Sequence, residues 1–314
     1  MKKKVFFAMC MVLALFIGSS GIASAASDRI VIGYSISNFN NAYQTYVYDG
    51  AVAYAEQNGI TVNVADAQDD VVKQLDDVKS LIEQGVNALI VIPVDTAAMR
   101  PITQAAVDAG ITLCYVNRNP FAGIEDTMPE GVFYVGSEEI VAGMLQMEYA
   151  AQLLGGAGNI AILMGQLGNE GAIKRLEGTE KVIAEQYSDI KILASETANW
   201  QRDEGMTVTE NFLIAYGQDL NAILAQNDEM AIGALNACRA ARRDDVIVLG
   251  IDAIPDMLEM VAAGDIPGTV LQDAKGQGAM GVEILHRVLS GESVEKVFWI
   301  PFVLVTQENV AEYR

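Results

Sequence analysis

Residues 221–233 read Asn-Ala-Ile-Leu-Ala-Gln-Asn-Asp-Glu-Met-Ala-Ile-Gly, a short apolar run followed by four polar residues and the start of a helical pattern. A run of four apolar residues that is bounded by polar ones is typical of a buried strand. The stretch therefore predicts a strand, a polar loop at its carboxyl end and a helix.

The same unit recurs along the chain. Short apolar or β-branched runs alternate with amphipathic stretches of helical spacing. Strands are predicted at 30–36, 60–65, 88–92, 111–116, 132–135, 159–164, 190–194, 222–225, 246–251 and 268–271. Helices are predicted at 43–58, 71–84, 99–109, 140–154, 173–186, 201–216, 229–242, 257–263 and 279–289. Near-continuous apolar strands separated by helices indicate parallel sheets covered on both faces, which is α/β doubly wound architecture.

Two halves of the chain share a short pattern. Asn87 precedes one predicted strand, and the next strand begins at Ile111. Asn221 precedes another in the same way, and its successor begins at Val246. The match favours two similar α/β halves, near residues 28–136 and 137–272.

Composition narrows the class of protein. Of the 314 residues, 51% are apolar and 19% are charged, which is ordinary for a globular chain with room for about two domains. Lys+Arg number 20 against 41 Asp+Glu, so the formal net charge is −21. A surface that acidic repels phosphate backbones, and we expect no nucleic-acid partner. One histidine and three cysteines leave little for a metal site or thiol catalysis.

Residues 1–25 are predicted to be a signal peptide. Three lysines at 2–4 precede an apolar run over 5–17, and small residues end in Ala-Ser-Ala at 23–25. The run is shorter than the ~20 residues of a spanning helix, and the whole pattern is that of a secretory signal. Cys10 lies inside the apolar run, where it does not fit lipid attachment. We expect cleavage before Ala26 and export to a periplasm.

The two remaining cysteines are predicted to be buried free thiols. Cys114 lies in a strand-like run and Cys238 in a helical pattern. A small apolar role in the core fits both positions, because even an oxidising compartment does not force a disulfide.

Polar side chains gather after the predicted strands, at the edge where open α/β sheets bind ligands. They lie in segments 37–43, 117–120, 197–202, 226–229, 252 and 272–273. These segments hold amides, carboxylates, arginines and aromatics, with no nucleophile–base pair. Such groups bind hydroxyls and cover the C–H faces of a ring. A helix N-cap or a turn is the alternative for single residues such as Asn41, Asp95 and Asp228. Together the segments predict a site for a neutral polyhydroxylated ligand.

Three motifs carry a resemblance to a known family. They are Asn227-Asp228-Glu229-Met230-Ala231-Ile232-Gly233-Ala234, Gly250-Ile251-Asp252 with Pro255-Asp256, and Pro93-Val94-Asp95-Thr96. With them the chain resembles the periplasmic sugar-binding proteins of the ribose and galactose type, the receptors of ATP-driven importers. Segments 115–120, 198–202 and 272–278 are most similar to the branch that binds inositol and rhizopine, an amino-inositol.

The resemblance implies ligand contacts from both halves of the chain. They are Asn41, Tyr43, Arg118, Trp200, Arg202, Asn227, Asp252 and Gln272, with Gln44 and Asn117 as flanking candidates. Ribose binders carry an aspartate where this chain has Asn117 and a second aromatic where it has Gln44. They also carry an asparagine at the position of Ile92 and an arginine at that of Ile173. These departures argue against ribose and leave the transport role unchanged.

The resemblance also implies a type I periplasmic-binding-protein architecture, with two Rossmann-like lobes joined by three crossing strands. The N-terminal lobe would be 28–136 plus 273–301, and the C-terminal lobe 137–272 plus 302–314. Hinge closure would capture a small neutral sugar or cyclitol in the interlobe cleft and deliver it to the membrane permease subunits of an ABC importer. A chemoreceptor is compatible with the same role. Ribose, galactose or another monosaccharide is the alternative ligand.

One motif and two rival classes are set aside. Residues 276–281, Gly-Gln-Gly-Ala-Met-Gly, match the dinucleotide pattern G-x-G-x-x-G, but that site needs the pattern early in a βαβ unit. Tight helix packing is the preferred interpretation, and no cofactor is expected. An enzyme of sugar metabolism would need a catalytic constellation that the sequence lacks. A sugar-responsive regulator would need a basic helix-turn-helix ahead of residue 30, where the predicted signal peptide lies.

Overall fold

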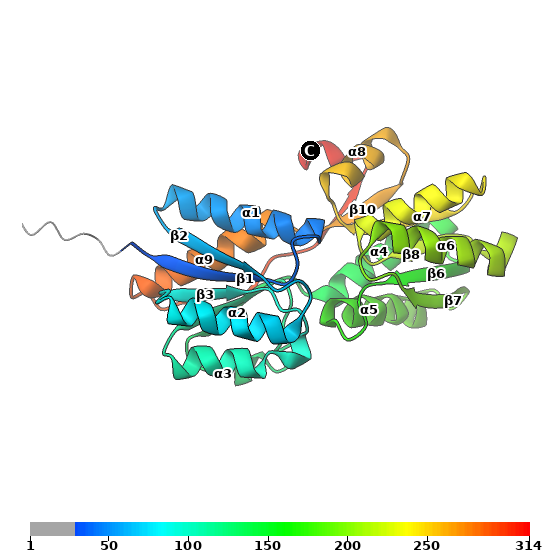
Figure 1. Cartoon of the computed structure of the whole chain (residues 1–314). Helices are drawn as coiled ribbons and strands as arrows, with labels where there is room; N and C mark the ends of the chain where they lie inside the picture. Colours follow the sequence, from blue (N-terminus) through cyan, green and yellow to red (C-terminus); the bar gives the residue numbers. More distant parts are fainter. Residues whose placement is uncertain (1–28) are drawn as a thin grey trace, which may run out of the picture.

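A computed structural model describes residues 29–314, which form two six-stranded sheets side by side (Figure 1). The first sheet has the order β11-β5-β4-β3-β1-β2 and is parallel throughout. Its strands are β1 (Val31–Ile36), β2 (Thr61–Asp66), β3 (Ala88–Val91), β4 (Thr112–Val116), β5 (Val132–Gly136) and β11 (Val297–Trp299). This sheet and its helices are called the N-terminal lobe below.

The second sheet has the equivalent order, β12-β10-β9-β8-β6-β7. Its strands are β6 (Gly158–Met164), β7 (Ile190–Thr197), β8 (Ala222–Ala225), β9 (Ile247–Asp252), β10 (Gly268–Leu271) and β12 (Val303–Thr306). The two sheets differ at their last strand, because β12 pairs with β10 in the antiparallel sense. This sheet and its helices are called the C-terminal lobe.

Helices cover both faces of each sheet (Figure 1). In the N-terminal lobe, α1 (Ala42–Gln57) packs with α9 (Ala274–Leu289), and α2 (Val71–Glu83) packs with α3 (Arg100–Asp108). In the C-terminal lobe, α4 (Glu139–Leu154) packs with α5 (Glu170–Gln186), and α6 (Arg202–Tyr216) packs with α7 (Asp228–Ala240). Helix α8 (Pro255–Ala263) follows β9.

Burial on both sides explains the apolar strands. In β3, Ile90 belongs to the core under α1 and α9, whereas Leu89 and Val91 belong to the core under α2 and α3. Alternate side chains of a strand point to opposite faces. A strand with helices on both faces therefore needs apolar residues at every position, as the sequence pattern indicated.

The short pattern shared by the halves has a structural counterpart. The side-chain Oδ1 of Asn87 accepts from the backbone N of Val31, at the start of the first strand of its lobe, at 2.7 Å. Oδ1 of Asn221 accepts from the backbone N of Asn159 at 2.8 Å, at the start of β6 in the other lobe. The two asparagines hold equivalent strand starts, which supports two similar halves.

The start of α9 differs from the prediction. The helix begins at Ala274, so the glycines of 276–281 lie within its first turns and not before it. The Asp273 side chain caps it by accepting from the backbone N of Gly276 at 2.8 Å. A Cβ on Gly278 would collide with the backbone oxygen of Val47 in α1. Close packing of α1 on α9 therefore accounts for the glycine, as the packing interpretation expected.

Three further observations bear on the predictions. Cys114 and Cys238 are both free and buried, as predicted. Within residues 29–314 no helix is long and apolar enough to cross a membrane. The predicted signal peptide, with Cys10, lies outside the described residues.

Candidate functional site

The carboxyl ends of the strands of both lobes meet at a cavity between the lobes. The cavity encloses about 420 Å³ of space, its opening to solvent included. It is lined by Asn41, Tyr43, Gln44, Asn117, Arg118, Glu139, Asn169, Glu170, Gly171, Arg175, Trp200, Asn227, Asp252 and Gln272.

Nine of the ten residues expected from the sequence line this cavity, and Arg202 does not. Arg202 starts α6 and lines a neighbouring cavity. Its guanidinium pairs with Glu229 at 2.7 Å and with Asp256 at 3.2 Å, and its side chain is 40% exposed. In this structure Arg202 is therefore held at the cleft's edge by two carboxylates.

The cavity also holds residues that sequence reasoning missed, above all Glu139 and Arg175. Glu139 begins α4, directly after the chain leaves the N-terminal sheet at β5. Arg175 lies in the second turn of α5 and is 5% exposed. Ile173, the position at which ribose binders carry an arginine, is 51% exposed. A charged residue at the start of a helix that follows a strand was a usable signal for Glu139. Nothing in the pattern of α5 showed that Arg175 would be buried.

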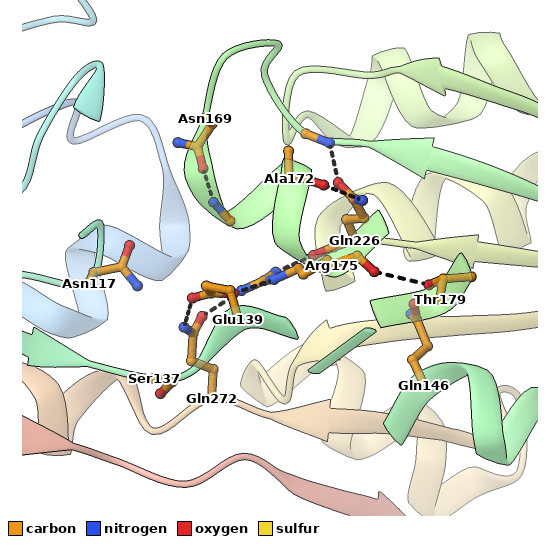
Figure 2. Close-up of polar contacts among 12 residues, drawn as sticks. Asn117, Ser137, Glu139, Gln146, Asn169, Ala172, Arg175, Thr179, Gln226 and Gln272 are labelled. Carbon is orange, nitrogen blue, oxygen red and sulfur yellow. Dashed lines mark hydrogen bonds and ion pairs between the residues drawn. The ribbon is translucent and has the colours of Figure 1, made fainter. Parts of the chain in front are cut away.

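Arg175 and Glu139 form a buried ion pair with Gln272 bound to both (Figure 2). Arg175 Nε donates to Glu139 Oε2 at 2.6 Å, and the two side chains are 6% and 3% exposed. Arg175 Nη2 donates to Gln272 Oε1 at 3.0 Å, and Gln272 Nε2 donates to Glu139 Oε1 at 2.8 Å. Burial lowers the pKa of Arg175, but the Glu139 and Asp252 carboxylates together more than offset it, so the net pKa is raised.

The same guanidinium is fixed from its other sides. Nη1 donates to the backbone oxygen of Gln226, whose side chain is itself bonded to Gly165 N and Ala172 O at 2.9 Å each (Figure 2). Its carbon lies 5.7 Å from the ring centroid of Trp200 and 5.8 Å from that of Phe302. Cation–π contact adds to the hydrogen bonds. Arg175 is therefore part of the rigid wall of the cavity.

Arg118 is a buried guanidinium of a different kind. Its Nη1 donates to the backbone oxygens of Pro93 at 2.7 Å and Val94 at 3.1 Å, and to Ser37 Oγ at 3.4 Å. Within residues 29–314 no carboxylate pairs with it, and its Nε and Nη2 make no hydrogen bond. Burial lowers its pKa to about 10, so it stays charged near neutral pH. Its free N–H groups are donors for a ligand.

Three side-chain amides present their amino groups to the cavity. A backbone N–H can only donate, so the amide oxygen must face it and the NH₂ group must point elsewhere. Oδ1 of Asn41 accepts from Gln44 N at 3.2 Å, Oε1 of Gln44 from Asn38 N at 3.3 Å, and Oδ1 of Asn169 from Gly171 N at 3.0 Å. Figure 2 shows Nδ2 of Asn169 pointing away from α5, toward the side of Asn117.

Asn117 presents the opposite group. Its Nδ2 donates to Gln277 Oε1 at 3.2 Å, and its own Oδ1 is left free. The backbone of Asn117 has φ 69, in the left-handed region that asparagine tolerates better than most residues. The cavity therefore has an amide acceptor on the N-terminal lobe, next to the donors of Arg118.

Two carboxylates of the C-terminal lobe supply strong acceptors. Among residues 29–314 neither the Asp252 nor the Glu170 carboxylate forms a hydrogen bond or an ion pair, although the Arg175 charge lowers both pKa values in part. Burial raises the pKa of Asp252 well above its usual range and that of Glu170 to about 8, with the Glu139 carboxylate adding to both shifts. Unpartnered buried carboxylates are costly, so they are retained where a ligand binds them.

Within residues 29–314, four of the six buried side-chain polar atoms without a partner lie in this one cavity. They are the hydroxyl of Tyr43, Nε1 of Trp200, Nδ2 of Asn169 and Oε2 of Glu170. A buried polar atom left unpaired costs about 1–3 kcal/mol. The arrangement can therefore bind hydroxyl groups on several sides at once. The cavity lining contains no serine, cysteine or histidine to act as nucleophile or base.

Comparisons with known proteins agree with this geometry. Residues 32–293 match the family described as periplasmic binding protein domain. The chain is 40% identical over 302 residues to the putative rhizopine-binding protein of Rhizobium meliloti, over 95% of this chain and 97% of that protein. It is 37% identical over 300 residues to the xylitol-binding protein of Mycolicibacterium smegmatis, over 95% and 83% respectively.

A solved structure gives the same answer. An ABC transporter solute-binding protein from Bacillus halodurans, with bound myo-inositol, matches at a TM-score of 0.85 and 42% identity, over 92% of this chain and 99% of that one. The chain belongs to the periplasmic binding protein family, whose members are solute-binding proteins. The predicted family and fold class are confirmed.

Proposed function

We propose that this member of the periplasmic binding protein family is the receptor of an ABC importer for a cyclitol, an inositol or amino-inositol, held in the cavity between its lobes. The observation that carries the proposal is the ring of unpaired donors and acceptors that both lobes present to that cavity. Donors come from Asn41, Gln44 and Arg118 on one side, and acceptors from Glu170 and Asp252 on the other.

The distribution of these groups favours a cyclitol over an aldose. A cyclitol has hydroxyls around its whole edge and no ring oxygen, so each side of it needs a partner. Tyr43 and Trp200, from opposite lobes, can cover its C–H faces. The relatives are in keeping with this, since their names or bound ligands are rhizopine, xylitol and myo-inositol, three polyhydroxylated molecules.

The cavity holds one more carboxyl group than it holds cations, which favours a cyclitol that bears an amine. Arg175 and Glu139 neutralise each other, which leaves the Arg118 cation against the carboxyl groups of Glu170 and Asp252. A neutral inositol is accommodated when one of these two carboxyl groups is protonated, which their raised pKa values allow. An ammonium group would bind the second carboxylate directly.

We propose hinge closure as the means of capture. The chain passes from the first sheet to the second between β5 and α4, back between β10 and α9, and over again between β11 and β12. These three passages would divide the chain into lobes 28–136 plus 273–301 and 137–272 plus 302–314. A ligand that contacts both lobes stabilises the closed state, because those contacts exist only there.

The remaining steps follow from the same role. We propose export to a periplasm by a signal peptide cleaved after Ala25, and delivery of the ligand to membrane permease subunits. A chemoreceptor would recognise the same closed form. With a cavity lining of amides, carboxylates and aromatics, the bound ligand would leave chemically unchanged and the chain would not be an enzyme.

Isothermal titration calorimetry tests the ligand class. Ligand-free protein is titrated with myo-inositol, scyllo-inosamine, xylitol, D-ribose and D-galactose at one pH. The proposal predicts that a cyclitol binds at least about 100-fold more tightly than ribose, because each buried group left unpaired costs about 1–3 kcal/mol. Submicromolar ribose or galactose with no heat from either cyclitol would contradict it. Recovery of each ligand unchanged after incubation is the test of the non-enzymatic role.

A further inference from the structure

Asp228 lies beneath the site without lining it. It is the first residue of α7, and its side chain is 0% exposed. The N-cap of that helix is its neighbour Asn227, whose Oδ1 accepts from Met230 N at 2.9 Å. Capping therefore does not account for Asp228, although the sequence suggested that role, and its carboxylate is directed into the lobe instead.

The Asp228 carboxylate joins two segments of the C-terminal lobe. Oδ2 accepts from the backbone N of Ile254 at 2.9 Å, and Oδ1 accepts from Thr269 Oγ1 in β10 at 2.6 Å. Among the residues from 29 onward no lysine or arginine pairs with it. A buried carboxylate without a paired cation needs hydrogen bonds to offset the cost of burial. The two contacts to Ile254 and Thr269 therefore account for a carboxylate at this buried position.

The segment that it holds is strained and carries a candidate ligand contact. Asp252 has φ 130 and Ala253 has φ 59, both in the region that favours glycine. Gly250, just before them, has no room for a Cβ because the Asp228 carboxylate occupies that space. Strained backbone persists only where its surroundings fix it. The bond from Ile254 N to Asp228 is the side-chain contact that anchors the end of this turn.

We propose that Asp228 is a positioning residue that fixes the backbone turn 252–254, so that the Asp252 carboxylate faces the cavity. The inference rests on the proposed role of Asp252 as a ligand contact. Both carboxylate oxygens accept hydrogen bonds, one from Ile254 N and one from the Thr269 hydroxyl. An asparagine would keep a single acceptor, so the charge would be lost and the Thr269 hydroxyl would have to reverse and accept from the NH₂ group.

Calorimetry with myo-inositol on a double-mutant cycle tests the coupling. The four proteins are wild type, Asp228→Asn, Asp252→Asn and the double variant. We expect Asp228→Asn to weaken binding at least about tenfold. Because Asp228 is proposed to act through Asp252, adding Asp228→Asn to a protein that already carries Asp252→Asn should change affinity less than about twofold. Additive losses in the double variant would show a general structural effect and would overturn the proposal.

Thr269 provides a second variant should Asp228→Asn fail to fold. Thr269→Val removes the hydroxyl donor at nearly constant volume, whereas Thr269→Ser keeps it. We expect Thr269→Val to weaken binding and Thr269→Ser to restore it to within about twofold of wild type. Asp70→Asn is the matched control, because Asp70 caps α2 in the other lobe and asparagine caps equally well. Equal affinities for the Val and Ser variants would contradict the proposal.

Hydrogen exchange on ligand-free protein separates this inference from the proposed function. Peptides that span residues 250–258 should exchange faster in Asp228→Asn than in wild type, while peptides from the N-terminal sheet should not change. Unchanged exchange at 250–258 would overturn the positioning role whatever the ligand is. If myo-inositol gives no heat with wild type, the ligand assignment fails, and the exchange result alone decides the role of Asp228.

Discussion

The two lobes each bury one arginine at the cavity and stabilise it in different ways. In the C-terminal lobe, Arg175 is bonded to the Glu139 carboxylate, to Gln272 and to a backbone oxygen, and aromatic rings lie near its carbon. In the N-terminal lobe, Arg118 is bonded only through Nη1, to neutral oxygen atoms. Of the two arginines, only Arg118 therefore keeps donors free on both Nε and Nη2.

The carboxylates show the reverse distribution. The C-terminal lobe contributes Asp252 and Glu170, neither of which has a protein partner. A ligand between the lobes would thus meet the Arg118 cation on one side and two carboxylates on the other, with amide groups on both sides. Burial and charge therefore do not by themselves mark a ligand contact. What marks it is hydrogen-bonding capacity that the protein leaves unused.

The largest effect is expected from Arg175→Met. Removal of one partner of a buried ion pair leaves Glu139 uncompensated, which costs about 3–5 kcal/mol of unfolding free energy. Thermal and urea unfolding of the ligand-free protein measure it. The double variant Arg175→Met with Glu139→Leu should recover much of the loss, because it removes both charges. A melting temperature equal to that of wild type in the single variant would show that Arg175 is not part of the scaffold.

Arg118→Ala should affect ligand affinity strongly and stability less, the reverse of what is expected for Arg175→Met. Its unused donors would make charge-assisted hydrogen bonds to the ligand, each worth about 1.5–3 kcal/mol, so affinity should fall at least about 100-fold. The unfolding free energy should fall by less than in Arg175→Met, because no buried carboxylate is left alone. Calorimetry and thermal unfolding on the same preparations measure both quantities. Wild-type affinity would remove Arg118 from the site.

A pH titration of stability examines the unpartnered carboxylate of Glu170. Burial raises its pKa to about 8 in the folded state, above the ordinary glutamate value of about 4.3 in the unfolded chain. The folded state then binds more protons than the unfolded state between these values, so the unfolding free energy falls as pH rises from about 4.3 to about 8. Asp228, with its pKa raised by burial to about 7, contributes in the same direction.

Glu170→Gln isolates the contribution of that group. Between pH 5 and pH 8.5 the unfolding free energy of the variant should fall less than that of wild type. The difference between the two falls should be on the order of a few kcal/mol. Urea unfolding at several pH values measures the two slopes, and Glu177→Gln, at an exposed position of the same helix, is the control. Identical slopes for Glu170→Gln and wild type would mean that Glu170 titrates normally.

The smallest effect is expected from Arg202→Ala. Arg202 is 40% exposed and bound to two carboxylates outside the cavity, and such exposed pairs are worth about 0–1 kcal/mol. Affinity for the ligand should change by less than about threefold. A loss as large as that of Arg118→Ala would show that Arg202 leaves Glu229 and enters the cavity when the lobes close.

Most of the cavity could be predicted because of the topology. Asn117, Asn227 and Asp252 lie at or just beyond the ends of strands, and the carboxyl ends of parallel strands meet at one edge of a sheet. The sequence therefore locates them without any knowledge of packing. Arg175 could not be placed in this way, since its burial depends on the ion pair that α5 forms with Glu139 of α4. Helical spacing does not reveal which arginine of a polar helix meets a distant carboxylate.

The same limit applies to the fold. Most strands and all the predicted helices were recognisable from apolar periodicity, but α9 begins at Ala274 and not at the predicted residue 279, so Gly276 and Gly278 lie inside the helix. Glycine usually disfavours a helix. Here the approach of the α1 backbone leaves no room for a side chain at Gly278, which is a contact between segments more than 200 residues apart in the chain. The edge strands β11 and β12 were missed, since only three-dimensional pairing defines them.

A crystal structure of the protein grown with myo-inositol is the most direct test of the account. We expect the ring between the lobes, with its hydroxyls bonded to the free Nε or Nη2 of Arg118 and to the Asp252 carboxylate, while Arg175 keeps its bond to Glu139. A ring bound elsewhere, or one that displaces Glu139 from Arg175 and leaves Arg118 without a ligand contact, would contradict it.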